Sequence, residues 1–178
     1  MDAGWAANPE AAAAGRKGEI ATAAVLNRFA SAYGPTVLHD LRMPRRGSSA
    51  NIDHILVSGR DVYIFDSKFW RPAVYWSLGC TRRGLVRFTT PDGRDLGAGK
   101  TLDTARQSVW KYLPHGVRVH RPVTVVWPSS RGALSVLLYR PKSSVAITGG
   151  QLPLYGKVFF PRAPADQEVV GLLAELLR

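Results

Sequence analysis

The sequence predicts a single α/β domain in which helices flank a mixed central β-sheet. A length of 178 residues suits one hydrophobic core, and a hydrophobic content of 46% is enough to fill it. The hydrophobic patterns follow the order helix, several strands, helix, buried strand, helix, which is typical of an α/β architecture. We therefore expect one domain over residues 16–178, preceded by a flexible, Ala-rich N-terminal arm over residues 1–15.

The first helix is predicted over residues 16–33. Ala23, Leu26 and Tyr33 recur at helical spacing, and Gly34-Pro35 ends the pattern. Counting back four residues from Ala23 leads to Glu19, so a carboxylate lies on the face that otherwise packs against the core. A polar group in that position needs a partner.

Short β-type runs follow at residues 36–41, 51–57 and 61–68, joined by a basic loop over 42–49 and by a turn over 58–60. Two more strands, over 74–77 and 85–89, are expected to flank a loop that carries Arg82 and Arg83. A second helix is predicted over 101–113, a fully buried strand over 122–127, a further strand over 134–139 and a closing helix over 166–177.

Residues 51–68 read as a β-hairpin that brings two acidic side chains together. With Gly59-Arg60 as a two-residue loop, Ser58 pairs with Asp61, and the same register places Asp53 opposite Asp66. Side chains alternate along a strand, so Asp53, Asp66 and Lys68 share one face of the hairpin, and His54 points to the other face, where we expect a structural hydrogen bond. A bulge would break this register.

Directly opposed carboxylates lie about 5 Å apart and repel each other by about 3 kcal/mol at an effective dielectric constant near 20. A divalent cation, Mg²⁺ or Mn²⁺, would relieve this repulsion, and it could polarise a phosphodiester and activate a water. Lys68 could orient or help deprotonate that water, or neutralise charge on the phosphate oxygens, and Glu19 could complete the acidic cluster. The alternative is structural: Asp66 and Lys68 form an ordinary ion pair, and Asp53 bonds a nearby loop. Apolar residues on both faces of the two strands favour the site.

These residues also carry a resemblance. Gly18-Glu19, Ile52-Asp53-His54-Ile55 and Phe65-Asp66-Ser67-Lys68 resemble the NERD (nuclease-related) domain, a branch of the PD-(D/E)xK nuclease superfamily. The resemblance implies a restriction-endonuclease-like core, Asp53 and Asp66 as Mg²⁺ ligands, Lys68 as a catalytic residue, Glu19 as a support for the metal or the lysine, and Gln107 as a site residue on the following helix. Related domains often continue Lys-Asn and then a Gly, whereas Phe69-Trp70-Arg71-Pro72 follows Lys68 in this chain.

The charge balance indicates a polyanionic partner. The chain holds 24 Lys and Arg against 13 Asp and Glu, a formal net charge of +11. Nucleic acid is the partner that this excess favours. The residues expected to contact it are Arg45, Arg46, Arg71, Arg82 and Arg83.

The sequence also argues against several classes of protein. A single cysteine, Cys80, rules out an internal disulfide, and no Cys/His spacing fits zinc. There is no run of 18 apolar residues, and the N-terminus lacks the pattern of an export signal, so we expect a cytoplasmic protein without a membrane partner. The expected function is that of a Mg²⁺- or Mn²⁺-dependent nuclease, with DNA favoured over RNA; the alternative is a non-catalytic nucleic-acid-binding or scaffold module. The oligomeric state is not predicted.

Overall fold

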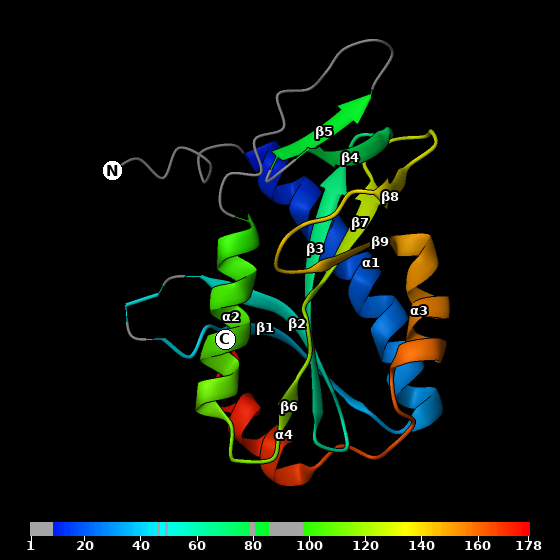
Figure 1. Cartoon of the computed structure of the whole chain (residues 1–178). Coiled ribbons are helices and arrows are strands. Elements are labelled where there is room, and N and C mark those ends of the chain that lie inside the picture. The colour runs from blue at the N-terminus through cyan, green and yellow to red at the C-terminus, as the bar shows by residue number, and fades with distance from the viewer. Residues whose placement is uncertain (1–8, 46, 49, 79–80, 86–97) are drawn as a thin grey trace.

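The structure is a computed structural model, and it describes residues 9–45, 47–48, 50–78, 81–85 and 98–178. Its elements, shown in Figure 1, are α1 (Pro9–Tyr33), β1 (Thr36–Arg42), β2 (Asn51–Ser58), β3 (Asp61–Trp70), β4 (Val74–Leu78), β5 (Thr81–Leu85), α2 (Ala98–Tyr112), β6 (Arg118–Val119), β7 (Val123–Pro128), β8 (Ser135–Leu138), β9 (Val145–Thr148), the 3-10 helix η1 (Gly149–Gln151), α3 (Leu152–Phe159) and α4 (Gln167–Ala174).

The main sheet has the order β1-β2-β3-β7-β9, and the short β6 also pairs with β3. The first three strands are antiparallel, whereas β7 and β9 run parallel to β3. A smaller sheet has the order β5-β4-β8. The predicted mixed sheet flanked by helices is confirmed.

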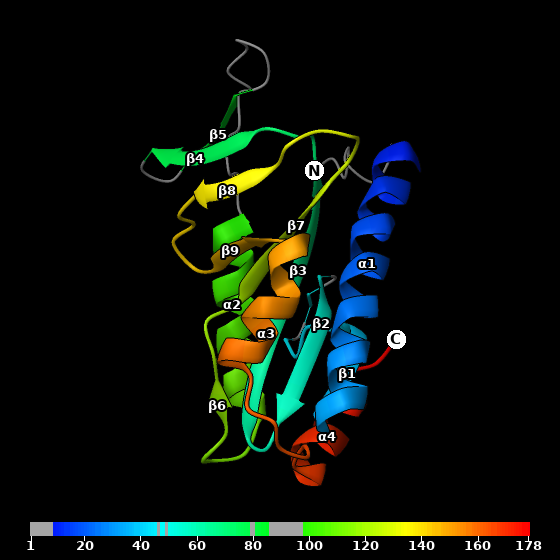
Figure 2. The same cartoon turned by 90° about the vertical axis from the view of Figure 1, so that its right-hand side faces the viewer.

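Helices cover both faces of the main sheet, as Figure 2 shows with α1 and α2 on opposite sides. On one face, Ile55 and Ile64 pack in a core cluster with Val109 of α2 and Val169 of α4. On the other face, Phe65 belongs to a second cluster, which is formed with Leu26 and Phe29 of α1 and Leu152 and Phe160 at the two ends of α3. The alternation of side chains along β2 and β3 therefore decides which helix each residue meets.

The β2–β3 hairpin forms in the predicted register. Ser58 pairs with Asp61, Ile55 with Ile64 and His54 with Phe65. Gly59 has a φ of 56°, the left-handed conformation that the first residue of a type II′ turn requires.

Two expected elements differ in the structure. The helix α1 begins at Pro9, so residues 9–15 of the expected arm are helical, in keeping with alanine's high helix propensity and proline's fit at the first helical position. Arg82 and Arg83 lie in the strand β5 and not in a loop, because Thr81–Leu85 pairs with β4. Of the strand expected over 85–89, residues 86–89 lie outside the described part of the chain.

The strands β6 and β9 and the helix α3 are not among the elements predicted from the sequence. Glycine and proline usually interrupt helices and strands. Gly149 and Gly150 nevertheless form η1, and Pro153 takes an early position in α3. Within the described residues, no helix is both long enough and apolar enough to cross a lipid bilayer.

Candidate active site

The acidic residues Asp53 and Asp66 lie where the β2–β3 ladder ends. The last main-chain pair is His54 with Phe65, and the next residue on each strand is one of the two aspartates. Beyond that pair, the main-chain amide of Ser67 donates a hydrogen bond to Oδ2 of Asp53 over 2.7 Å. A side-chain carboxylate thus holds β2 to β3 at this point, and the two acids come from adjacent strands as predicted.

Lys68 pairs with Asp66 on the same strand. Its Nζ lies 2.6 Å from Oδ1 of Asp66, and the two side chains are 34% and 17% exposed. The other carboxylate oxygen of Asp66, Oδ2, is buried. This short contact in a half-buried setting is a strong charge-assisted hydrogen bond, and it fixes the ammonium beside the acidic pair.

The electrostatics of the site reflect burial and the closeness of other charges. Burial and the nearby Asp66 carboxylate raise the pKa of Asp53 to about 7, although the Ser67 amide and Lys68 oppose that shift. Burial works to lower the pKa of Lys68, but the Asp66 carboxylate outweighs it and the pKa of Lys68 lies above its usual value. The structure therefore keeps two carboxylates close together at an energetic cost.

Glu19 lies on α1, half-buried, beside the same group of charges. Its negative charge helps to raise the pKa of both Asp53 and Lys68. The preceding Gly18 is buried, and a Cβ atom placed there would lie 3.6 Å from the main-chain carbonyl of Lys68, so α1 passes close to β3 at this point. Among the described residues, no three His, Cys, Asp or Glu side chains are close enough to form a complete metal cluster.

His54 lies on the opposite face of β2 from Asp53, as predicted, and is buried. Its Nε2 is 3.2 Å from Oγ of Ser67, and its Nδ1 is 2.8 Å from Nδ1 of His39. Ser67 in turn donates to Oγ1 of Thr22, whose hydroxyl donates to the carbonyl of Gly18. Since Ser67 has one proton to give, His54 is assigned as the donor to Ser67 through Nε2.

Burial, followed by the charge of His39, lowers the pKa of His54 to about 3, so this imidazole is neutral at physiological pH. Trp127 also donates from Nε1 to Oγ1 of Thr22, over 2.9 Å. The network joins α1, β1, β2, β3 and β7 directly behind the acidic pair. It supports the site structurally, which is the role expected for His54.

Four residues of this network, Thr22, His39, Ser67 and Trp127, were not singled out from the sequence. The sequence does indicate a structural position for Ser67, because side chains alternate along a strand and the residue between Asp66 and Lys68 must face α1. Thr22 lies four residues after Gly18 on the helical face that packs on the sheet, where a hydroxyl needs a partner.

Gln107 lies on α2, and its side chain donates to Oδ2 of Asp103 over 2.8 Å. It is exposed and lines a groove with Arg45 and Lys111. Among the hydrogen bonds of the described residues, none joins Gln107 to Asp53, Asp66 or Lys68. Its part in the catalytic site stays a prediction.

The five arginines predicted to contact nucleic acid are scattered. Arg45 is exposed on the connection between β1 and β2, and Arg71 is exposed directly after β3. Arg46 lies outside the described residues, and the structure describes only the backbone of Arg82 and Arg83, in β5.

Comparison with known proteins gives one match. The family model of the NERD, or nuclease-related, domain matches residues 14–94, which include Glu19, Asp53, Asp66 and Lys68 but not Gln107. No curated protein and no solved structure matches the chain. The match covers less than half of the chain, and this part, which holds the acidic pair, is similar to nuclease-related domains.

Proposed function

We propose that the protein is a metal-dependent nuclease that hydrolyses phosphodiester bonds of nucleic acid, with DNA favoured over RNA. The observation that carries the proposal is the grouping of Asp53, Asp66 and Lys68 at the end of the β2–β3 ladder, with Lys68 Nζ 2.6 Å from Asp66 Oδ1. The match of residues 14–94 to the model of a nuclease-related domain supports it.

The residues present fit a hard divalent cation such as Mg²⁺ or Mn²⁺. Mg²⁺ sites that act on phosphates commonly use one or two carboxylates and complete their shell with water and substrate oxygens, so a pair of acids is a sufficient protein contribution. Burial and the nearby Asp66 carboxylate raise the pKa of Asp53, and a bound cation would favour the ionised form of this acid. When bound, the cation would polarise the scissile phosphate and lower the pKa of a water.

The chain's own residues have distinct parts in this proposal. Asp53 and Asp66 hold the cation, and the Ser67 amide orients Asp53 through its hydrogen bond to Oδ2. The ammonium of Lys68 donates to a phosphate oxygen and neutralises the charge that develops there, which is worth most in a partly dehydrated site. Glu19 adds negative charge beside this group and supports the cation or Lys68.

The positive charge of the chain supports nucleic acid as the class of substrate. A net charge of +11 attracts a polyanion, and exposed arginines such as Arg45 and Arg71 offer contacts to phosphates. Such contacts position a strand without reading its sequence.

The test is cleavage of end-labelled single-stranded DNA, duplex DNA and RNA with Mg²⁺, Mn²⁺ or EDTA. We expect cleavage only with metal, loss of cleavage in Asp66→Asn, and a rate about 100-fold lower in Lys68→Met. Glu168→Gln is the control, because it also removes one negative charge but lies on α4, where it pairs with Arg60 of the β2–β3 turn. Cleavage that survives Asp66→Asn would overturn the proposal. Binding of nucleic acid without cleavage of any substrate would overturn it too, in favour of a binding module.

A further inference from the structure

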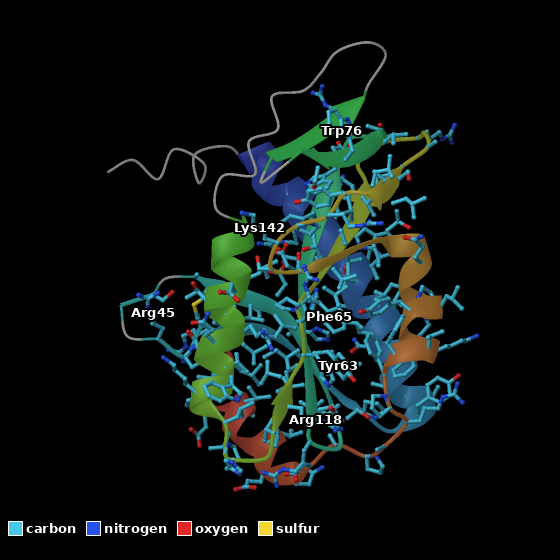
Figure 3. All side chains as sticks on the ribbon, in the orientation of Figure 1. Arg45, Tyr63, Phe65, Trp76, Arg118 and Lys142 are labelled. Atoms are coloured by element: carbon cyan, nitrogen blue, oxygen red, sulfur yellow. The ribbon has the colours of Figure 1, made fainter. Side chains whose placement is uncertain are left out.

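A polar groove of about 520 Å³ lies between α2 and the connection that joins β1 to β2. Figure 3 shows Arg45 on that connection, beside α2. The groove is lined by Arg45, Thr104, Gln107, Ser108, Lys111 and Tyr112, with Pro44.

The lining of the groove is suited to an anion. Arg45 supplies a guanidinium from the connection, and Lys111 supplies an ammonium from α2. Thr104, Gln107 and Ser108 add hydroxyl and amide groups to the lining, at the helical spacing that gathers side chains on one side of α2. Guanidinium, ammonium, hydroxyl and amide groups are the side-chain donors that proteins use for phosphate oxygens.

Two carboxylates lie near these residues, and each already accepts a hydrogen bond. Asp103 accepts from the Gln107 amide, and Glu175 accepts from the Tyr112 hydroxyl over 3.1 Å. Neither acid lines the groove. The groove therefore has one cationic side chain on each side, and no carboxylate among its lining residues.

The groove also lies on the catalytic side of the sheet. Helix α2 packs through Val109 on the face of β2 and β3 that carries Ile55 and Ile64. Asp53 and Asp66 are each two residues from one of these isoleucines, so strand alternation directs them to the same face. Arg45 lies on the connection that leads into β2, and Asp53 lies near the start of that strand.

We infer that this groove binds the sugar–phosphate backbone of the nucleic acid next to the bond that is cut, with Arg45 and Lys111 contacting phosphates. The inference rests on the proposed nuclease function for the identity of the substrate. It gives Gln107 a place in substrate positioning, beside the strand, and not among the groups that act on the scissile phosphate. Phosphates are common to DNA and RNA, so the groove by itself accepts either.

The test measures binding in EDTA, where no metal-dependent cleavage occurs. Fluorescence anisotropy follows a labelled single-stranded DNA 20-mer, the RNA of the same sequence and a DNA duplex. The groove variant is Arg45→Gln/Lys111→Gln. The matched control is Arg28→Gln/Lys157→Gln, which also removes one Arg and one Lys charge, but from the exposed surfaces of α1 and α3.

We expect the groove variant to raise the Kd by about 10-fold or more. It should also flatten the dependence of log K on log salt by about 1.4, which corresponds to two lost phosphate contacts on a single strand. The control should change the Kd by less than about 2-fold, since its cations lie on the other side of the sheet. Circular dichroism and thermal unfolding of both variants check that each is folded.

Equal losses in the two double variants would overturn the inference, because they would show a response to net charge alone. Unchanged binding by a folded groove variant would overturn it as well. If the wild type cuts DNA and the groove variant binds normally, the inference fails and the nuclease function stands. If only the groove variant loses binding but the wild type cuts nothing, the groove stands and the nuclease function fails.

Discussion

The main-chain amide of Ser67 donates a hydrogen bond to the side chain of Asp53 over 2.7 Å. This contact joins the acid of β2 to the residue that separates Asp66 from Lys68 on β3. The Ser67 hydroxyl, on the other face, contacts His54 and Thr22. One residue thus connects the acidic pair to the buried network that ties α1 to the sheet.

Ser67→Ala should destabilise the protein and slow the proposed cleavage. The substitution leaves His54 and Thr22 without their hydroxyl partner in the core, at a cost of about 1–3 kcal/mol. The hydrogen bond from the Ser67 main-chain amide to Asp53 is retained, so metal binding should persist. Urea unfolding measures the loss, and Ser129→Ala, at an exposed serine, serves as the control. A free energy of unfolding equal to that of the wild type would show that the network contributes little.

The metal-free protein should lose stability as the pH rises from about 4 to about 7. The pKa of Asp53 is raised from 3.8 to about 7 in the folded state, so its neutral form stabilises the fold and ionisation withdraws that contribution. Asp53→Asn stays neutral and should be more stable than the wild type at pH 8, by roughly 2–4 kcal/mol, with no such gain at pH 4. Thermal unfolding in EDTA across this range provides the measurement. A constant difference between the two proteins would contradict the assignment.

Asp61 should give the opposite pH dependence. This aspartate is buried, and Arg118 and His120 bind its two oxygens over 2.6–2.7 Å. Burial alone would raise the pKa of Asp61, but these partners hold it below its usual value. The ionised form therefore stabilises the fold above the unfolded pKa of 3.8, and this contribution is lost as the pH falls toward the folded pKa.

Asp61→Asn should accordingly lower the free energy of unfolding at pH 7, because it leaves Arg118 and His120 beside a neutral group. The loss should be modest, since the Arg118 side chain is 74% exposed and water can solvate it. The cost should shrink as the pH falls below about 4. Denaturant unfolding at both pH values tests this expectation, and a cost that grows in acid would refute it.

Gly149→Ala should disturb Trp127, whereas Gly150→Ala should not. A Cβ at Gly149 would lie 2.3–2.4 Å from ring atoms of Trp127, and nothing lies within 4 Å of a Cβ at Gly150. The clash should cost about 1–3 kcal/mol and weaken the bond from Trp127 to Thr22. Tryptophan fluorescence and thermal unfolding report both effects, and similar behaviour of the two variants would argue against the close packing.

The hairpin that carries the site could be predicted because its information is local. Gly59 selects the turn, and alternating apolar residues select the register, so Asp53 and Asp66 could be placed from the sequence. The Ser67–Asp53 contact could not, because it forms where the ladder stops and a side chain replaces a main-chain partner. The sequence therefore predicts which residues meet at the site, but it does not predict the hydrogen bonds between them.

Elements whose own residues give weak strand or helix signals were the ones that sequence patterns missed. The strand β5 contains two arginines and a glycine, and it forms because it pairs with β4. The helix α3 follows two glycines and contains a proline, yet Leu152 at its start packs with Phe29 of α1. Gln107 was linked to the catalytic residues by resemblance, and only the structure shows the groove that it shares with Arg45 and Lys111.

The most direct test of the central claim is a Mn²⁺ titration followed by electron paramagnetic resonance, in which bound Mn²⁺ disappears from the signal of the free ion. We expect saturable binding by the wild type and by Glu168→Gln, and loss of binding in Asp53→Asn and in Asp66→Asn, with all four proteins folded. Equal Mn²⁺ binding by the wild type and Asp66→Asn would contradict it.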